Sequence, residues 1–136
     1  MGKLVIGLAS GSLEKLVVAS TVTGGAVALD MAVDIFLLLG GAYAFRKDVA
    51  GTGTYTDRPE LAGEMAAGMA GSAVPAPLDS LRQLKTDGDV HIHCCGTAGK
   101  IWGAGALDDF VDIVDDIVGV AEYVTSCEDA DVVQVL

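Results

Sequence analysis

The segment DVHIHCCGTAGKIWG, residues 89–103, holds the side chains whose types and spacing best suit chemistry. Apolar and polar residues alternate through its first half, which predicts a β-strand about seven residues long. Gly96 ends this strand, and Thr97 can cap a short helix that carries Lys100 in its first turn. A thiol between the carboxyl end of a strand and the amino end of a helix, near an ammonium group, is stabilised as the thiolate. Cys95 is therefore the predicted nucleophile.

Small and hydroxyl-bearing residues surround Cys95 in this prediction. Gly96 and Gly99 allow the backbone to close around the sulfur, and Thr97 offers a hydrogen bond to it. A second turn, after the first predicted strand, lies at the same edge of a parallel sheet. The predicted catalytic residues are Cys95, Lys100 and Thr97, and the predicted ligand-binding residues are Ser10, Gly11, Gly96 and Gly99.

A metal site is a competing interpretation of the same strand. His91, His93 and Cys95 project from one face at positions i, i+2 and i+4, and imidazole with thiolate suits zinc or copper. Three ligands along one strand span about 13 Å, so such a site would use His93 and Cys95 with a ligand from elsewhere. Alternatively, the histidines are hydrogen-bonding or interface residues, or His93 is a base toward Cys95, although no Ser-His-Asp or CxxC arrangement accompanies it. The sequence leaves these alternatives open.

The other two cysteines are expected to be structural. Cys94 projects from the opposite face of the strand, where a buried thiol acts as a small apolar side chain. Cys127 occupies an inward position of a predicted helix, and a disulfide between Cys94 and Cys95 would be strained. Three cysteines, two of them adjacent, do not make a disulfide framework. We therefore expect a reducing, cytoplasmic location.

Composition and charge exclude several functional classes. A chain of 136 residues fits one domain, and 51% hydrophobic residues with 5% aromatic residues predict an aliphatic core. A net charge of −11 with eight scattered basic residues argues against nucleic acid as the main ligand. The longest uncharged runs, residues 16–29 and 35–45, are shorter than the roughly 20 residues that span a bilayer. No cleavable signal precedes the first strand pattern, and no membrane partner is expected.

Alternating strand and helix patterns predict the fold. Strands are expected at residues 3–9, 31–39, 90–95, 116–118 and 131–136, and helices after Ser12, at 78–87 and at 119–127. This order predicts an α/β three-layer sandwich with a mostly parallel, roughly five-stranded sheet.

Two segments fit that pattern less simply. Residues 107–114 are acidic and amphipathic, with Leu107, Phe110, Val111 and Val114 expected to face inward. Residues 48–77, with a weak helical pattern at 60–69, form a variable excursion, which is a lid, an oligomer contact or a tolerated insertion.

Four segments resemble the DsrE/DsrF-like family, in particular its peroxiredoxin-like branch of small sulfur-handling proteins. They cover most of the chain outside residues 48–77, with Cys95 in the family's cysteine position and Gly103 eight residues later. The four segments are SGSLEKLVVAS, VDIFLLLGGAYAFRK, VHIHCCGTAGKIWG and GVAEYVTSCEDADVVQVL.

The resemblance implies one DsrE-like domain over residues 1–136 and a cytoplasmic homo-oligomer, often a trimer or a hexamer. It also implies that the loop cysteine carries sulfur as a persulfide between donor and acceptor proteins, a sulfurtransferase-like role without a cofactor. The family often has a serine three residues after the cysteine, whereas Ala98 stands here, so its hydroxyl is missing unless Thr97 replaces it. A metal-binding protein and a non-catalytic oligomeric binding module, with a phosphate or flavin pocket but no GxGxxG or P-loop spacing, are the alternative functions.

Overall fold

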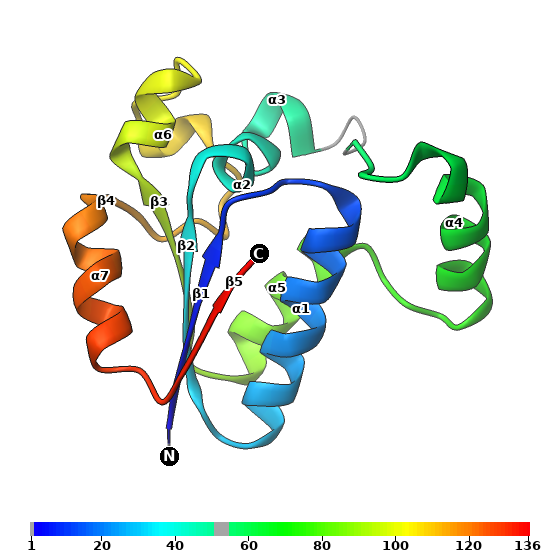
Figure 1. Ribbon diagram of the computed structural model, residues 1–136, viewed down its shortest axis with the longest axis horizontal. Helices are drawn as coiled ribbons and strands as arrows, with labels where there is room; N and C mark the ends of the chain where they lie inside the picture. Colours follow the sequence, from blue (N-terminus) through cyan, green and yellow to red (C-terminus); the bar gives the residue numbers. More distant parts are fainter. Residues whose placement is uncertain (1, 51–54) are drawn as a thin grey trace.

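Five parallel strands in the order β4-β3-β2-β1-β5 form the centre of the computed structural model, which describes residues 2–50 and 55–136 (Figure 1). The predicted parallel sheet is confirmed, with shorter strand ends than expected. The strands are β1 Lys3–Leu8, β2 Ala32–Leu37, β3 Val90–Cys95, β4 Asp116–Val118 and β5 Val132–Val135.

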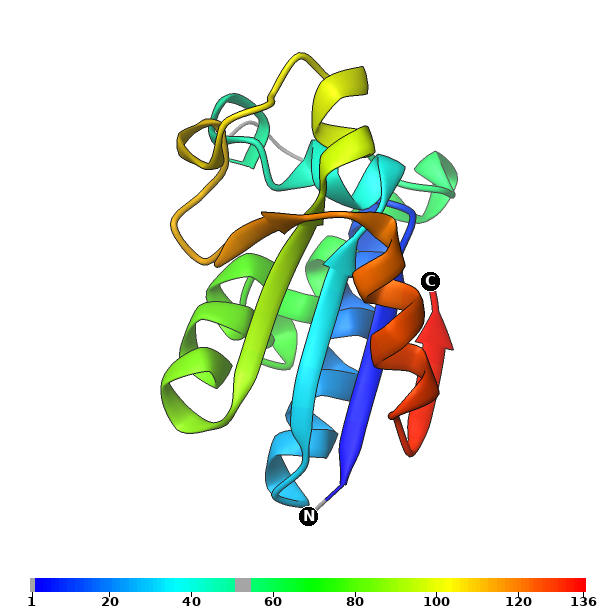
Figure 2. The ribbon, with the colours of Figure 1, turned by 90° about the vertical axis from the view of Figure 1, so that its left-hand side faces the viewer.

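Helices cover both faces of the sheet and its carboxyl edge. Helices α1 (Leu13–Ala28) and α5 (Pro77–Asp87) pack together on one face, and α7 (Val120–Glu128) lies on the other (Figures 1 and 2). Three short helices lie beyond the carboxyl ends of the strands: α2 Leu39–Ala44, α3 Lys47–Ala50 and α6 Gly96–Ile101. The three-layer α/β sandwich predicted from the sequence is therefore confirmed. Across the described ranges, no helix is both long and apolar enough to cross a membrane.

Strands β1 and β2 are mainly apolar because both of their faces are covered. Leu4 and Leu8 of β1 and Ile35 of β2 are at most 2% exposed, as expected for strands in a parallel sheet. Strand β3 instead alternates, with Ile92 in the core and His91 exposed. The face of β3 opposite α1 and α5 is therefore only partly covered.

Glycines let α2 approach the end of β1. A Cβ atom on Gly41 would collide with the Leu8 carbonyl oxygen, and one on Gly11 would collide with the Gly40 carbonyl oxygen. The Gly40 amide donates to the Ala9 carbonyl oxygen at 2.9 Å. The βα turn after β1 and the start of α2 are thus in direct backbone contact.

The excursion at residues 48–77 contains more helix than expected. It includes the end of α3, a 3₁₀ turn (Pro59–Leu61) and α4 (Ala62–Gly71), while residues 51–54 lie outside the described residues. The part that begins at Tyr55 contacts the β1–α1 turn, because the Gly11 amide donates to the Tyr55 hydroxyl at 3.1 Å. The Ser12 hydroxyl, which also accepts from the amide of Lys15 at the start of α1, donates to Asp57 at 2.8 Å. Helix α4 itself has no buried residue.

The acidic segment at residues 107–114 is only partly as predicted. Phe110 and Val114 are buried, at 1% and 4% exposure, but Leu107 is 44% exposed, so its inward placement was wrong. Only a 3₁₀ turn (Leu107–Asp109) forms there. The Val111 amide donates to the Phe45 carbonyl oxygen at 2.9 Å, and this long-range bond replaces the bonds of a continued helix.

Two glycine substitutions test this packing. We expect Gly41→Ala to lower the free energy of unfolding by about 1–3 kcal/mol, because the new methyl group collides with backbone that cannot move independently. Gly25→Ala in α1 is the matched control, since no atom lies within 4 Å of the added Cβ, and it should raise stability by up to about 1 kcal/mol. Urea unfolding measures both values. Equal effects of the two substitutions would contradict the close approach of α2 to β1.

Candidate functional site

Strand β3 passes into α6 without a loop, and Cys95 is the residue at the junction. It is the last residue of β3 and the N-cap of α6, with φ −68° and ψ 125°. The predicted location between a strand end and a helix start is therefore confirmed. The prediction that Thr97 caps this helix is wrong, because the helix already begins at Gly96. The Cys95 residue is 7% exposed.

The residues predicted to assist Cys95 have different surroundings. Thr97 and Lys100 are exposed on α6, and neither makes a hydrogen bond to the Cys95 sulfur in the described structure. A Cβ atom on Gly99 would lie 2.6 Å from the Ala104 carbonyl oxygen, so this glycine makes room for the chain that returns from α6. A Cβ atom on Gly96 would be 3.5 Å from the Val118 carbonyl oxygen, an ordinary contact.

The turn with Ser10 and Gly11 is not next to Cys95. It follows β1, whereas Cys95 ends β3, and β2 lies between them. Two strand spacings correspond to about 10 Å. Ser10 and Gly11 instead contact the Tyr55 hydroxyl, at 3.4 Å and 3.1 Å. The structure therefore does not join these two predicted ligand-binding residues with the cysteine in one site.

Cys94 is a core residue, as predicted. It is fully buried, and its thiol donates a long hydrogen bond of 3.5 Å to the Cys95 carbonyl oxygen. Burial, together with the neighbouring Cys95, raises the pKa of the Cys94 thiol to about 11. Cys94 is thus protonated at neutral pH and does not act as a nucleophile. Cys95 is also buried, but at 7% exposure it is the one of the two adjacent cysteines that keeps some accessible surface.

Cys127 is partly exposed on α7 and lies close to Tyr123. Burial, and then a hydrogen bond with Cys127, raise the pKa of the Tyr123 phenol. The Tyr123 hydroxyl lies over Gly7, where a Cβ atom would be 2.5 Å from it. Cys127 therefore belongs to the packing of α7 against β1, consistent with its predicted inward position.

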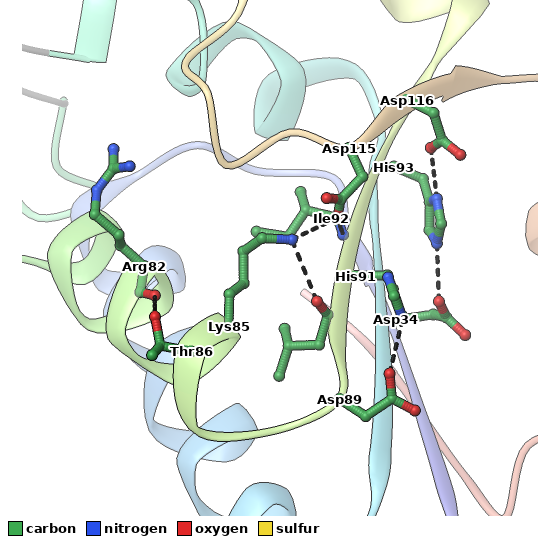
Figure 3. A network of polar contacts seen from close by, with 11 residues as sticks. Asp34, Arg82, Lys85, Thr86, Asp89, His91, Ile92, His93, Asp115 and Asp116 are labelled. Carbon is green, nitrogen blue, oxygen red and sulfur yellow. Dashed lines mark hydrogen bonds and ion pairs between the residues drawn. The ribbon is translucent and has the colours of Figure 1, made fainter.

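His93 lies between two carboxylates from neighbouring strands (Figure 3). Its Nε2 is 2.8 Å from Asp34 Oδ1 on β2, and its Nδ1 is 2.6 Å from Asp116 Oδ1 on β4. The hydrogen bond to Asp34, assisted by Asp116 and opposed by partial burial, raises the pKa of His93 to about 9. His93, in turn, is the main cause of the lowered pKa of Asp34, which also pairs with Lys3 Nζ at 3.2 Å. His93 is therefore an imidazolium at neutral pH.

This arrangement decides between the roles proposed for the histidines. With both ring nitrogens bonded to carboxylates, His93 has no free lone pair for a proton from Cys95 or for a metal ion. His91 is 53% exposed and pairs with Asp89 at 2.7 Å. No group of three His, Cys, Asp or Glu side chains among residues 2–50 and 55–136 is placed to hold a metal ion. The geometry thus favours the hydrogen-bonding interpretation of these histidines.

Sequence reasoning did not find Asp34 and Asp116 as partners of His93. One signal was present, because Asp34 is a single carboxylate within the apolar run VDIFLLL. A charge in a central strand requires a partner on the adjacent strand. The partner can be identified only when the strand register is known. In that register Asp34 lies opposite His91, and His93 lies opposite Asp116.

A second ion pair holds the other face of β3 (Figure 3). Lys85 of α5 contacts Asp115 Oδ2 at 2.5 Å and donates to the Val90 carbonyl oxygen at 3.2 Å. The same Asp115 oxygen accepts the Ile92 amide at 2.7 Å. The strand that ends in Cys95 is thus fixed by side chains from α5, β2 and β4.

The cations beyond α6 are already paired. A cavity of about 200 Å³ is lined by Arg46 and Lys47 near Gly103. Arg46 Nη2 contacts Asp48 at 2.6 Å, and Lys47 Nζ contacts Asp108 at 3.0 Å. This cavity therefore offers no unpaired cation to a second anion.

Comparisons with known proteins establish the fold alone. No protein-family model matches the chain, and no curated protein matches it. Among solved structures, MTH1491 from Methanobacterium thermoautotrophicum, a protein of unknown function, is similar with a TM-score of 0.61 and 14% sequence identity. The similarity covers 98% of this chain and 99% of that one. The whole described architecture is therefore shared with another protein.

The charge on His93 predicts a pH dependence of stability. The pKa of His93 is raised from 6.5 to about 9 in the folded protein, so the imidazolium adds stability fully below pH 6.5. That stability is lost as the pH rises through about 9, and it is on the order of 2–3 kcal/mol. Urea unfolding between pH 6 and pH 9.5 should show the loss in the wild type and not in His93→Gln. His91→Gln, at an exposed position, should keep it, and an equal slope in wild type and His93→Gln would contradict the raised pKa.

The burial of Cys94 predicts selective alkylation. Iodoacetamide at neutral pH should modify Cys95 and leave Cys94 unmodified in the folded protein, because the Cys94 thiol is inaccessible and protonated. In urea both cysteines should react at similar rates. Peptide mass spectrometry locates the label, and rapid labelling of Cys94 before unfolding would show that its placement is wrong.

Proposed function

We propose that this protein carries sulfur as a persulfide on Cys95 and passes it between a donor protein and an acceptor protein. The observation that carries this proposal is the position of Cys95 as both the last residue of β3 and the N-cap of α6. The sequence resemblance to small sulfur-handling proteins supports the same assignment. The inert, buried Cys94 leaves Cys95 as the reactive member of the pair.

The transfer needs no oxidant, because the incoming sulfur keeps its oxidation state. The Cys95 thiolate attacks the terminal sulfur of a donor persulfide, the new sulfur–sulfur bond forms, and the donor's own sulfur–sulfur bond breaks. The donor leaves as a thiolate. In the second step an acceptor thiolate attacks the terminal sulfur on Cys95, and Cys95 leaves as the thiolate from which it started.

The start of α6 provides groups that stabilise an anionic sulfur. The amide N–H groups in the first turn of a helix have no partner within it, and the N-cap side chain lies next to them. Lys100 adds an exposed ammonium on the same short helix. Ala98, which is 3% exposed, stands where the resembled family often has a serine and offers no hydroxyl. The neighbouring Thr97 supplies a hydroxyl instead. In this proposal Thr97 and Lys100 turn toward the sulfur when it is charged.

Limited access suits a carrier that must keep a labile group. Only 7% of Cys95 is exposed, so water and oxidants reach the sulfur less freely than they reach a surface thiol. A partner must therefore present its sulfur on a protruding group. The resemblance implies that the carrier is a cytoplasmic homo-oligomer, a trimer or a hexamer, and the proposal includes both properties.

Sulfur uptake by cysteine variants tests the proposal. After incubation with a small-molecule persulfide donor, the wild type should gain the mass of one sulfur atom, and Cys95→Ser should gain none. Cys127→Ser is the matched control and should load like the wild type. Cys127 lies against Tyr123 on α7, away from the junction of β3 and α6 that holds Cys95. Intact mass spectrometry measures the gain, and circular dichroism confirms the fold. Unchanged loading of Cys95→Ser would refute the assignment.

A further inference from the structure

The two edges of the sheet are protected to very different degrees. Strand β4 has three residues, begins at Asp116 and follows Asp115, so charge and shortness hinder pairing with another strand. Strand β5 (Val132–Val135) has no charged residue or proline. Its Val132, Val133 and Val135 are 44%, 43% and 67% exposed. An apolar edge without such protection is a surface for strand addition.

Helix α7, which precedes β5 in the chain, also carries exposed valines. It packs on the face of the sheet at β1 and has no buried residue. Val120 and Val124, one helical turn apart, are 55% and 54% exposed, while Tyr123 packs over Gly7.

The open backbone groups of β5 can be assigned from its pairing with β1. The Leu136 amide donates to the Gly7 carbonyl oxygen at 2.8 Å, and the Leu136 carbonyl oxygen accepts from the Ala9 amide at 2.7 Å, so Leu136 points its backbone toward β1. In a parallel ladder this direction alternates from one residue to the next. Val132 and Gln134 therefore also face β1, in keeping with their register opposite Leu4 and Ile6, and Val133 and Val135 direct their N–H and C=O groups away from the sheet.

We propose that β5 pairs antiparallel with β5 of a second copy of this chain, about a two-fold axis at Val133. Val133 of each copy then faces Val133 of the other, and this pair exchanges two backbone hydrogen bonds across the axis. Val132 of each copy faces Gln134 of the other in the closer, non-hydrogen-bonded type of pair. The result is one continuous sheet with the protected β4 edges at its outer ends. A two-fold contact of this type is closed and adds no further copies.

The charge of the chain is compatible with this pairing and with its direction. Each copy carries a net charge of −11, and Asp131 stands next to β5. Antiparallel pairing about Val133 separates the two Asp131 residues by about 14 Å along the strands, beyond the Debye length of about 8 Å at physiological salt. Parallel pairing would place them about 5 Å apart. The uncharged sequence VVQV is complementary to itself in the antiparallel direction.

The proposed pairing does not depend on sulfur chemistry at Cys95. Strand β5 lies at the edge of the sheet, and β1 and β2 separate it from β3, which ends in Cys95. Cys95→Ser should therefore leave the association unchanged. Failure of sulfur loading and failure of pairing are thus separate results.

Disulfide trapping tests the register. In a Cys95→Ser, Cys127→Ser background, Val133→Cys should form a cross-linked dimer with oxidised glutathione, because its Cα atoms lie about 5.5 Å apart across the axis, within disulfide range. Val132→Cys is the matched control, at 44% against 43% exposure. In the dimer, position 132 of one copy is offset along the strands by two residues from position 132 of the other. Their Cα atoms therefore lie more than about 7 Å apart, too far for a disulfide. Equal cross-linking of both variants, or of neither, would overturn the register.

Solution mass gives an independent measurement without added cysteines. Light scattering coupled to gel filtration should show a dimer, or a larger assembly built from dimers, for the wild type. Val133→Glu places two carboxylates against each other at the axis and should halve the mass, whereas Lys15→Glu, on α1, should not. Circular dichroism confirms that both variants fold. A two-fold contact can contribute to a hexamer but not to a trimer, so a monomeric or trimeric wild type, or an unchanged mass for Val133→Glu, would overturn the proposal.

Discussion

The site depends on one backbone constraint, the direct passage of β3 into α6. An extended strand and a helix meet at a single residue, so the side chain at that residue is held by both elements. The return of the chain after α6 is equally tight, since the Ala104 amide donates to the Gly99 carbonyl oxygen at 2.8 Å and no side chain fits at Gly99. Cys95 is therefore positioned by backbone geometry rather than by hydrogen bonds to its sulfur. A thiol held in this way keeps its lone pairs available for a substrate.

The polar face of the sheet holds β3 in register. His93 joins Asp34 and Asp116 across three strands, and the pair of Lys85 and Asp115 acts from α5 on the other side. The cost of placing such charges in a partly covered sheet is offset only when each has its partner. A shift of β3 by one residue would separate all of these pairs and would turn the Cys95 side chain to the opposite face of the sheet. The same ion pairs thus fix the strand and the exposure of its last residue.

The sequence predicted most of the fold because buried parallel strands are continuous apolar runs, as in β1 and β2, and because Gly96 marks the end of β3. It also placed Cys94 and Cys95 on opposite faces. It could not show that both nitrogens of His93 are occupied, since its partners come from strands 59 and 23 residues away. The predicted cap at Thr97 failed because β3 needs no turn residue before α6. Ser10 and Gly11 share the sheet edge with Cys95, but strand order, which places β2 between them, was not available from the sequence.

The central claim is that sulfur is held on Cys95 and on no other residue of the native protein. It is tested most directly by digestion of the sulfur-loaded wild type and fragmentation of the peptide that contains Cys94 and Cys95, because cleavage between these residues assigns the added atom to one of them. The account predicts that all of the added sulfur lies on Cys95, since the Cys94 thiol is buried and protonated. Added sulfur on Cys94 or Cys127, or none on Cys95, would contradict it.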